Sequence, residues 1–155
     1  MNGRALCLLV PAAALLVVVG CNPRQARAEK AVTTYRTSLE EVIRFNEAFK
    51  GRPEVLDQPG FVNVLNQNIG LLNNEKAAVD QFVKNLKEDQ LLQKVTTQAF
   101  SLEQLPTVMR ASLGVSGLPT SHYSKNEKLV ILWTDEMHAV IQPRVNEINK
   151  LAETK

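Results

Sequence analysis

The spacing of apolar residues, which follows steps of three and four along most of the chain, constrains the fold most. Between residues 28 and 49 the steps are four, three, four, three and seven, and Asn46 stands where the longest step passes over a turn. This spacing predicts one apolar stripe on a helix. Gly51 and Pro53 are expected to end the helix, with Gly51 as a left-handed cap. The stripe consists of Ala28, Val32, Tyr35, Leu39, Val42 and Phe49.

A second series predicts a helix over about residues 58–88, with Pro59 in its first turn. Gly70 and the Asn73-Asn74 pair weaken this helix, so two shorter helices with a break there are the alternative. Asparagines lie largely on the opposite face. The apolar face consists of Phe61, Leu65, Ile69, Leu72, Val79, Phe82, Val83 and Leu86.

Residues 89–113 are less regular. Leu91 to Phe100 indicate a short helix, and the capping-box pattern from Ser101 to Gln104 indicates the start of another, with Pro106 in its first turns. Three glycine and proline residues, at positions 114, 117 and 119, then mark a loop.

The last apolar series follows a second capping-box pattern, from Ser124 to Glu127. It keeps helical spacing from Leu129 to Leu151, and Pro143 inside it is expected to bend the helix. No segment has the pattern of a convincing strand. Four amphipathic segments with short connections predict an all-α domain over residues 28–155, folded as an antiparallel bundle of about four helices.

The N-terminal residues 1–20 have a different character. Arg4 is their single charge, and an uncharged, mostly apolar run follows it. A basic start, an apolar run and a small final residue are typical of an export signal. The run is shorter than the ~20 apolar residues of a membrane-spanning helix, and Pro11 interrupts it, so a permanent transmembrane anchor is the weaker alternative.

The end of this run, Val18-Val19-Gly20-Cys21, resembles the lipobox of bacterial lipoproteins. The resemblance implies a signal peptide over residues 1–20 that is cleaved between Gly20 and Cys21. It also implies a diacylglycerol on the Cys21 thiol and a new amine that can take an acyl chain such as palmitate. Two or three such chains anchor a protein stably. Residues 21–27 would then form the lipidated cysteine and a short tether, and an ordinary signal peptide with an incidental cysteine is the alternative.

The residue after Cys21 bears on location. An aspartate there retains lipoproteins of Gram-negative bacteria in the inner membrane, so Asn22 favours the periplasmic face of the outer membrane. Cys7 would be removed with the signal peptide, which leaves Cys21 as the lone thiol and excludes an internal disulfide.

The charged residues and motifs give little sign of enzyme chemistry. Eighteen basic and sixteen acidic residues provide no basic field for nucleic acid. The sequence has no phosphate-binding glycine loop, nucleophile elbow or paired-histidine metal motif, so neither a cofactor nor a metal is expected. A haem ligated by histidine and methionine is a weak alternative, because Met109 and Met137 fit the apolar stripes.

These observations predict a lipid-anchored, non-enzymatic binding or assembly module of the cell envelope, which acts through protein contacts. Candidate partner-binding residues are Leu118 and Tyr123 in the loop, and Trp133, for which a core position is the competing interpretation. The alternative is a periplasmic ligand or metal carrier. It would use His138 with Asp135, three residues earlier on the same helical face, and His122.

Overall fold

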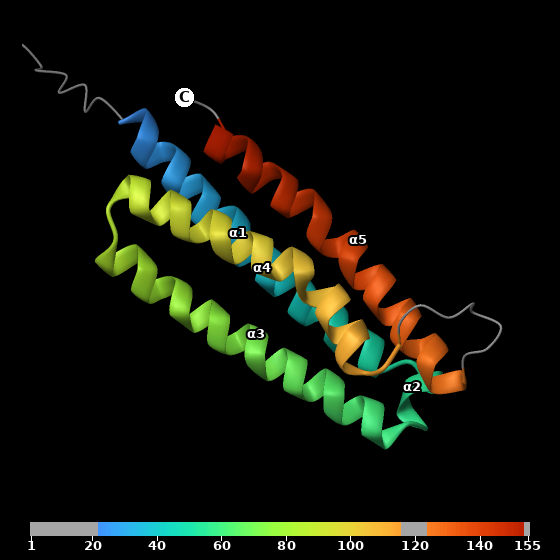
Figure 1. The fold of residues 1–155 in the computed structure, drawn as a ribbon. Helices are drawn as coiled ribbons and strands as arrows, with labels where there is room; N and C mark the ends of the chain where they lie inside the picture. Colours follow the sequence, from blue (N-terminus) through green and yellow to red (C-terminus); the bar gives the residue numbers. More distant parts are fainter. Residues whose placement is uncertain (1–21, 116–123, 154–155) are drawn as a thin grey trace, which may run out of the picture.

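The structure, a computed structural model, describes residues 22–115 and 124–153. This part of the chain forms five helices and no strand, and four long helices alternate in direction along one axis (Figure 1). The predicted all-α antiparallel bundle is therefore confirmed. The helices are α1 (Pro23–Lys50), α2 (Pro53–Leu56), α3 (Pro59–Asn85), α4 (Glu88–Ser112) and α5 (Lys125–Glu153).

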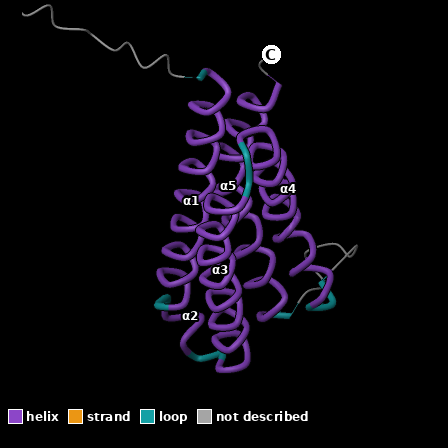
Figure 2. The backbone as a smooth tube through the Cα atoms, turned by 90° about the vertical axis from the view of Figure 1, so that its left-hand side faces the viewer, coloured by secondary structure: helices purple, strands orange, loops and turns teal. Residues whose placement is uncertain are grey.

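Helix α1 is the centre of the bundle. It packs against α3, α4 and α5, and α4 also packs closely against α5. Helices α3 and α4 follow one another in the chain but barely touch. Within the described residues, α3 and α4 therefore leave an open edge between them. The start of α1, the end of α5 and the α3–α4 connection lie at one end of the bundle, and α2 lies at the other (Figures 1 and 2).

Helix α1 begins earlier and ends differently from the prediction. The Asn22 side chain accepts a hydrogen bond from the Arg24 backbone N–H at 3.1 Å, and Pro23 occupies the first turn. Residues 23–27, expected as a tether, are therefore helical. Gly51 has a φ of −76°, so the predicted left-handed cap is wrong. Its N–H bonds to the Ala48 carbonyl, and the short α2 begins at Pro53.

Helices α3 and α4 are each continuous. Helix α3 passes through Gly70 without a break, and α4 passes through Ser101, so a helix start at Ser101 is wrong. The Ser101 hydroxyl instead donates to the carbonyl of Thr97, one turn earlier. Gly114, with a φ of +74°, follows the end of α4, and the N–H of Val115 bonds back to the Arg110 carbonyl.

The predicted capping box of the last helix is confirmed. The Glu127 N–H donates to Ser124 Oγ at 3.3 Å, and the Ser124 N–H donates to Glu127 Oε2 at 2.6 Å. Hydrogen bonding to the Glu127 carboxylate from the Ser124 side chain and backbone N–H holds the pKa of Glu127 below its usual value. Helix α5 then continues through the exposed Pro143 to Glu153.

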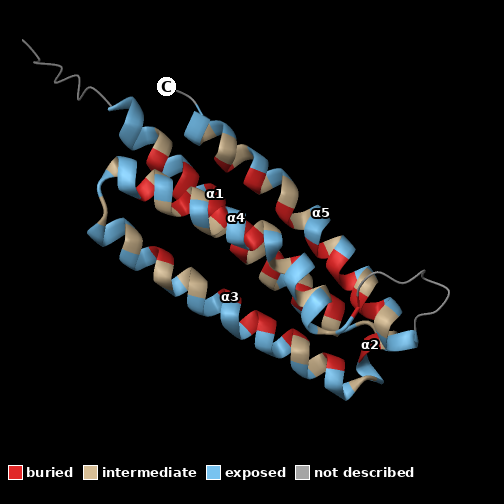
Figure 3. Ribbon diagram, in the orientation of Figure 1, coloured by how far each residue is buried: buried red, intermediate tan, exposed pale blue. Residues whose placement is uncertain are grey.

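The apolar stripes converge between the helices, and buried residues follow the inner faces (Figure 3). Trp133 is fully buried, with the Phe61 ring edge-on at 5.5 Å between centroids. Its indole N–H donates to Asn46 Oδ1 at 2.9 Å, and the Asn46 amide donates to the Val42 carbonyl at 2.7 Å. Both polar atoms of Asn46, which interrupts the α1 stripe, thus have a partner inside the core.

Candidate functional site

The predicted lipidation site, Gly20 and Cys21, lies outside the described residues, as do Leu118, His122 and Tyr123 of the predicted recognition loop. Helix α1 begins two residues after Cys21. Two extended residues span about 7 Å, so a lipid on Cys21 would keep this end of the bundle near a bilayer. None of the described helices is long and apolar enough to span a membrane.

The prediction of Trp133 as a partner-binding residue is wrong. Trp133 has no exposed surface and is enclosed between helices α1, α3 and α5, so it is a core residue and not a partner-binding side chain. Its apolar ring fills the core and its N–H is paired with Asn46, which accounts for a tryptophan at a fully enclosed position.

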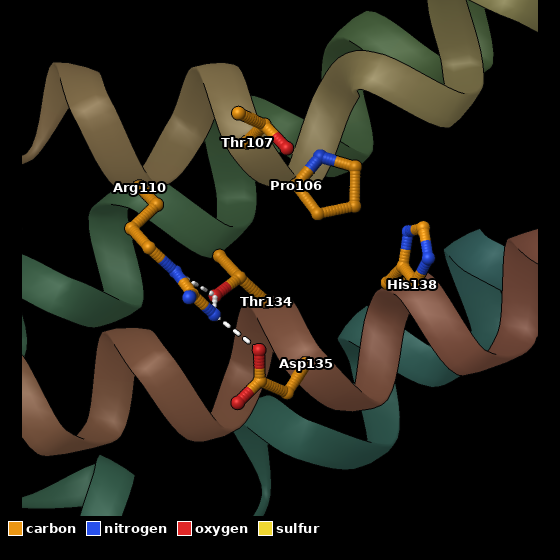
Figure 4. A pocket seen from close by; sticks show the side chains of 6 residues that line it. All are labelled: Pro106, Thr107, Arg110, Thr134, Asp135 and His138. Carbon is orange, nitrogen blue, oxygen red and sulfur yellow. Dashed lines mark hydrogen bonds and ion pairs between the residues drawn. The ribbon is translucent and has the colours of Figure 1, made fainter. Parts of the chain in front are cut away.

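Asp135 and His138 line a cleft of about 440 Å³ between α4 and α5 (Figure 4). Arg110 of α4 donates to the Asp135 carboxylate and to Thr134 Oγ1, at 2.6 Å for Nη2. The figure shows Asp135 directed toward Arg110, with the His138 ring further along the helix near Pro106. The carboxylate predicted to support a histidine ligand is therefore held by an arginine.

The described residues, 22–115 and 124–153, contain no group of three histidine, cysteine, aspartate or glutamate side chains placed to hold a metal ion. In the cleft, recruitment of Asp135 by a metal would require its ion pair with Arg110 to break. Arg110 also donates to the Ile131 carbonyl at 3.3 Å, so its guanidinium fastens α4 to α5. The geometry favours a structural role for this cluster.

A different concavity lies at the open edge of the bundle. It is a groove of about 260 Å³ with Tyr35 and Leu39 of α1 at its base and α3 and α4 as its walls. We call it the α3–α4 groove. Its walls are lined by Asn68, Leu71, Leu72, Glu75, Gln98, Ser101, Leu102 and Leu105. Leu71 is 63% exposed, and no other described element covers it.

A polar cluster crosses the α3–α4 groove. Glu75 Oε1 accepts hydrogen bonds from the Tyr35 hydroxyl at 3.1 Å and from Gln98 Nε2 at 2.7 Å. Burial raises the pKa of Tyr35 well above its usual value, and the Glu75 carboxylate raises it further. The hydroxyl therefore stays protonated and remains a donor. Glu75 Oε2 has no hydrogen-bond partner among the described residues.

Asn68 is the most unusual residue of the groove. It is fully buried, and neither its Nδ2 nor its Oδ1 has a partner within the described chain. A buried polar group without a hydrogen bond costs about 1–3 kcal/mol. This cost draws attention to the groove that Asn68 lines.

The sequence prediction missed Asn68 and Glu75, although a signal was present. The α3 stripe steps by four and three through positions 61, 65, 68, 72, 75, 79, 82 and 86. Asn68 and Glu75 are its two polar members, and Gln98 holds the equivalent place between Val95 and Leu102 in α4. Polar residues at such positions of an apolar stripe mark a buried hydrogen bond or a binding surface.

Comparison with known proteins adds no relative, because no family model, curated protein or solved structure matches the chain.

Proposed function

We propose that the protein is a lipid-anchored, non-enzymatic binding module of the bacterial cell envelope that acts through protein contacts. The α3–α4 groove carries this proposal. It combines an exposed leucine, apolar walls and a buried amide that has no partner among the described residues, at the edge where α3 and α4 barely touch. An apolar surface with unmet hydrogen-bonding groups is what a partner can complete.

The lipobox residues supply the location. Lipidation at Cys21, with α1 beginning at Pro23, would hold the bundle by its α1 end at the membrane surface. Helix α1, which begins two residues after the proposed anchor, also forms the base of the α3–α4 groove. We propose the periplasmic face of the outer membrane as this location, on the basis of Asn22.

The proposal is tested by isotope-quantified recovery of crosslinked proteins from membranes that contain the wild-type chain or one of three variants. Leu71→Glu places a charge in the groove, and Cys21→Ser removes the lipid. Phe100→Glu is the matched control, because Phe100 is 60% exposed on α4 but lies outside the groove. We expect the same partners with wild type and Phe100→Glu, and their loss with Leu71→Glu and Cys21→Ser. Equal recovery with all four chains would overturn the proposal.

Lipidation itself is tested by the mass of the protein purified from membranes. We expect a chain that begins at Cys21 and carries a diacylglycerol, with or without a further acyl chain. An unmodified Cys21, or a retained leader, would contradict this part of the proposal.

A ligand carrier is the second candidate, because the α4–α5 cleft, at about 440 Å³, falls within the usual ~300–1,000 Å³ of small-molecule sites. Titration with Zn²⁺ or with inorganic phosphate, followed by the His138 ring signals in NMR spectra, tests it. A shift that His138→Gln abolishes would support a carrier, and unchanged signals would exclude these two ligands.

A further inference from the structure

We propose that the α3–α4 groove binds a short amphipathic helix of a partner protein, and that this helix carries a cationic side chain among its apolar residues. The inference rests on the proposed function and names the chemistry of the partner. It is drawn from the size of the groove, from its ends and from its charges.

The size of the groove favours inserted side chains over a whole small molecule. Its volume of about 260 Å³ lies below the ~300–1,000 Å³ of typical small-molecule sites. Its walls are two antiparallel helices, and its base is a third. A docked helix would pack on these walls as one further helix of the bundle and would complete the open edge.

One end of the groove is bridged. The Lys94 ammonium of α4 lies 4.9 Å from the centre of the Phe82 ring of α3, and this cation–π contact joins the two walls. The α4 residues that line the groove run from Gln98 to Leu105, which is about 11 Å at 1.5 Å per residue. This length accommodates about two turns of helix. The occupant is therefore short, and its side chains reach Leu71, Leu102 and Leu105.

The charges identify the partner's chemistry. Among the described residues that line the groove, Glu75 alone is charged. The exposed neighbours of the groove, one turn from Leu71 or Ser101, are uncharged: Gln67, Asn74, Thr97 and Gln104. A lone carboxylate with one oxygen unpaired within the described chain is complemented by a lysine or arginine. The uncharged surroundings suit the polar flanks of a helix and offer no basic patch for phosphate.

A second copy of the chain fits this surface less well. Two identical grooves related by a twofold axis along the groove would bring the two Glu75 carboxylates together, and like charges at an interface oppose association. If the axis crosses the groove, each Glu75 would instead face the uncharged end of the other groove, lined by Asn68 and Leu105, and would lose water without gaining a counter-ion. A different protein with a cation at this place meets neither cost, so the charge pattern selects a heterologous partner.

The test uses two peptides of about 18 residues, long enough for about five turns. Both carry leucines at helical spacing, and they differ at one central position of the apolar face, which is Lys in one and Glu in the other. Each labelled peptide is titrated with the lipidated protein in nanodiscs of neutral lipid, and binding is read by fluorescence anisotropy with empty nanodiscs as the blank. We expect the Lys peptide to bind at least about tenfold more tightly than the Glu peptide.

Three variants make the result specific. Glu75→Gln keeps the side-chain shape and should bring the affinities of the two peptides to near equality. Leu71→Glu places a charge against the leucines of the peptide and should weaken binding of the Lys peptide at least about tenfold. We expect this loss even though the added carboxylate also attracts the lysine. Phe100→Glu should change neither affinity. Circular dichroism confirms that each variant is folded.

Several results would overturn the inference. These are equal affinities of the two peptides for the wild-type protein, wild-type binding by the Leu71→Glu chain, or no binding of either peptide at about 1 mM. A wild-type dimer in sedimentation that Leu71→Glu dissolves would assign the groove to a second copy instead. If the peptides fail while Leu71→Glu still loses its membrane partners, the helix is wrong and the proposed function stands. If membrane partners are also unaffected, both are wrong.

Discussion

Two buried asparagines of the same bundle should respond to the same substitution in opposite directions. Asn46 and Asn68 are each 0% exposed. Asn46 is paired on both sides, with the Trp133 indole N–H at 2.9 Å and the Val42 carbonyl at 2.7 Å. Asn68 has no partner for either polar atom within the described chain. Replacement by leucine therefore removes hydrogen bonds at one position and unmet polar groups at the other.

The magnitudes follow from what each substitution leaves behind. Asn46→Leu leaves the Trp133 N–H buried without an acceptor, at about 1–3 kcal/mol, and forces a larger side chain into a filled core. We expect a loss of about 2–4 kcal/mol. Asn68→Leu removes two unmet groups and adds apolar burial beside a groove that gives the side chain room. We expect a gain of about 1–3 kcal/mol, or roughly 3–5 °C in Tm per kcal/mol.

Urea denaturation of each full chain measures the free energy of unfolding. Trp133, the only tryptophan, reports the transition by fluorescence without an added label. The expected result is a higher midpoint for Asn68→Leu and a lower midpoint for Asn46→Leu, with unchanged slopes. Midpoints that move in the same direction would refute the reasoning, because the two sites would then not differ in how their amides are satisfied.

The remaining predictions concern pH and helix capping. Because the pKa of Tyr35 is raised in the folded chain, the unfolded chain loses this proton first as the pH rises above about 10, and the stability of the fold should decrease there. The Tyr35→Phe variant should lose less stability between pH 9 and pH 11, as measured by urea denaturation. Arg144 donates to both Glu41 oxygens, at 3.0 and 2.7 Å, and holds the Glu41 pKa below its usual value, so this pair should stabilise the fold at neutral pH and lose its effect as the pH falls through that lowered value. Because both side chains are partly exposed, Glu41→Gln should cost at most about 1 kcal/mol at pH 7 and nothing at low pH, as measured by urea midpoints at both pH values. Ser124→Ala removes the α5 cap and should cost about 1 kcal/mol, measured in the same way, whereas Ser112→Ala, which leaves that cap intact, should have a smaller effect.

The long helices could be predicted because their apolar stripes are regular, whereas the continuity of α4 could not. A Ser-x-x-Gln sequence starts a helix when the serine caps it, but Ser101 in mid-helix bonds to the Thr97 carbonyl. Leu102 and Pro106, which follow Ser101 in α4, are buried against the bundle, and this packing outweighs the local signal. Residues 23–27 were missed for the opposite reason, since Asn22 and Pro23 form a helix start that an apolar pattern does not reveal.

The residues of the candidate sites could likewise be predicted only in part from the sequence. The spacing of Asp135 and His138 placed both residues on one face of α5, and the structure brings both to one cleft. Arg110, which takes the Asp135 carboxylate, comes from another helix and could not be paired with it before the helix order in space was known. The open edge is also a property of the packing, because no local pattern indicates that α3 turns away from α4.

Polar residues in an apolar stripe thus have two different meanings in this bundle, and the packing separates them. Asn46 lies where α1 and α5 pack closely, so the Trp133 indole of α5 reaches its side chain and the hydrogen bond forms within the core. Asn68 occupies the same kind of stripe position on α3, but it faces the edge where α4 stands apart. Glu75, one heptad later on the same edge, receives Tyr35 and Gln98 on one oxygen only. Asn68, buried without a partner among the described residues, is costly for the bundle alone, whereas the second oxygen of the partly exposed Glu75 is open to a cation from a partner helix.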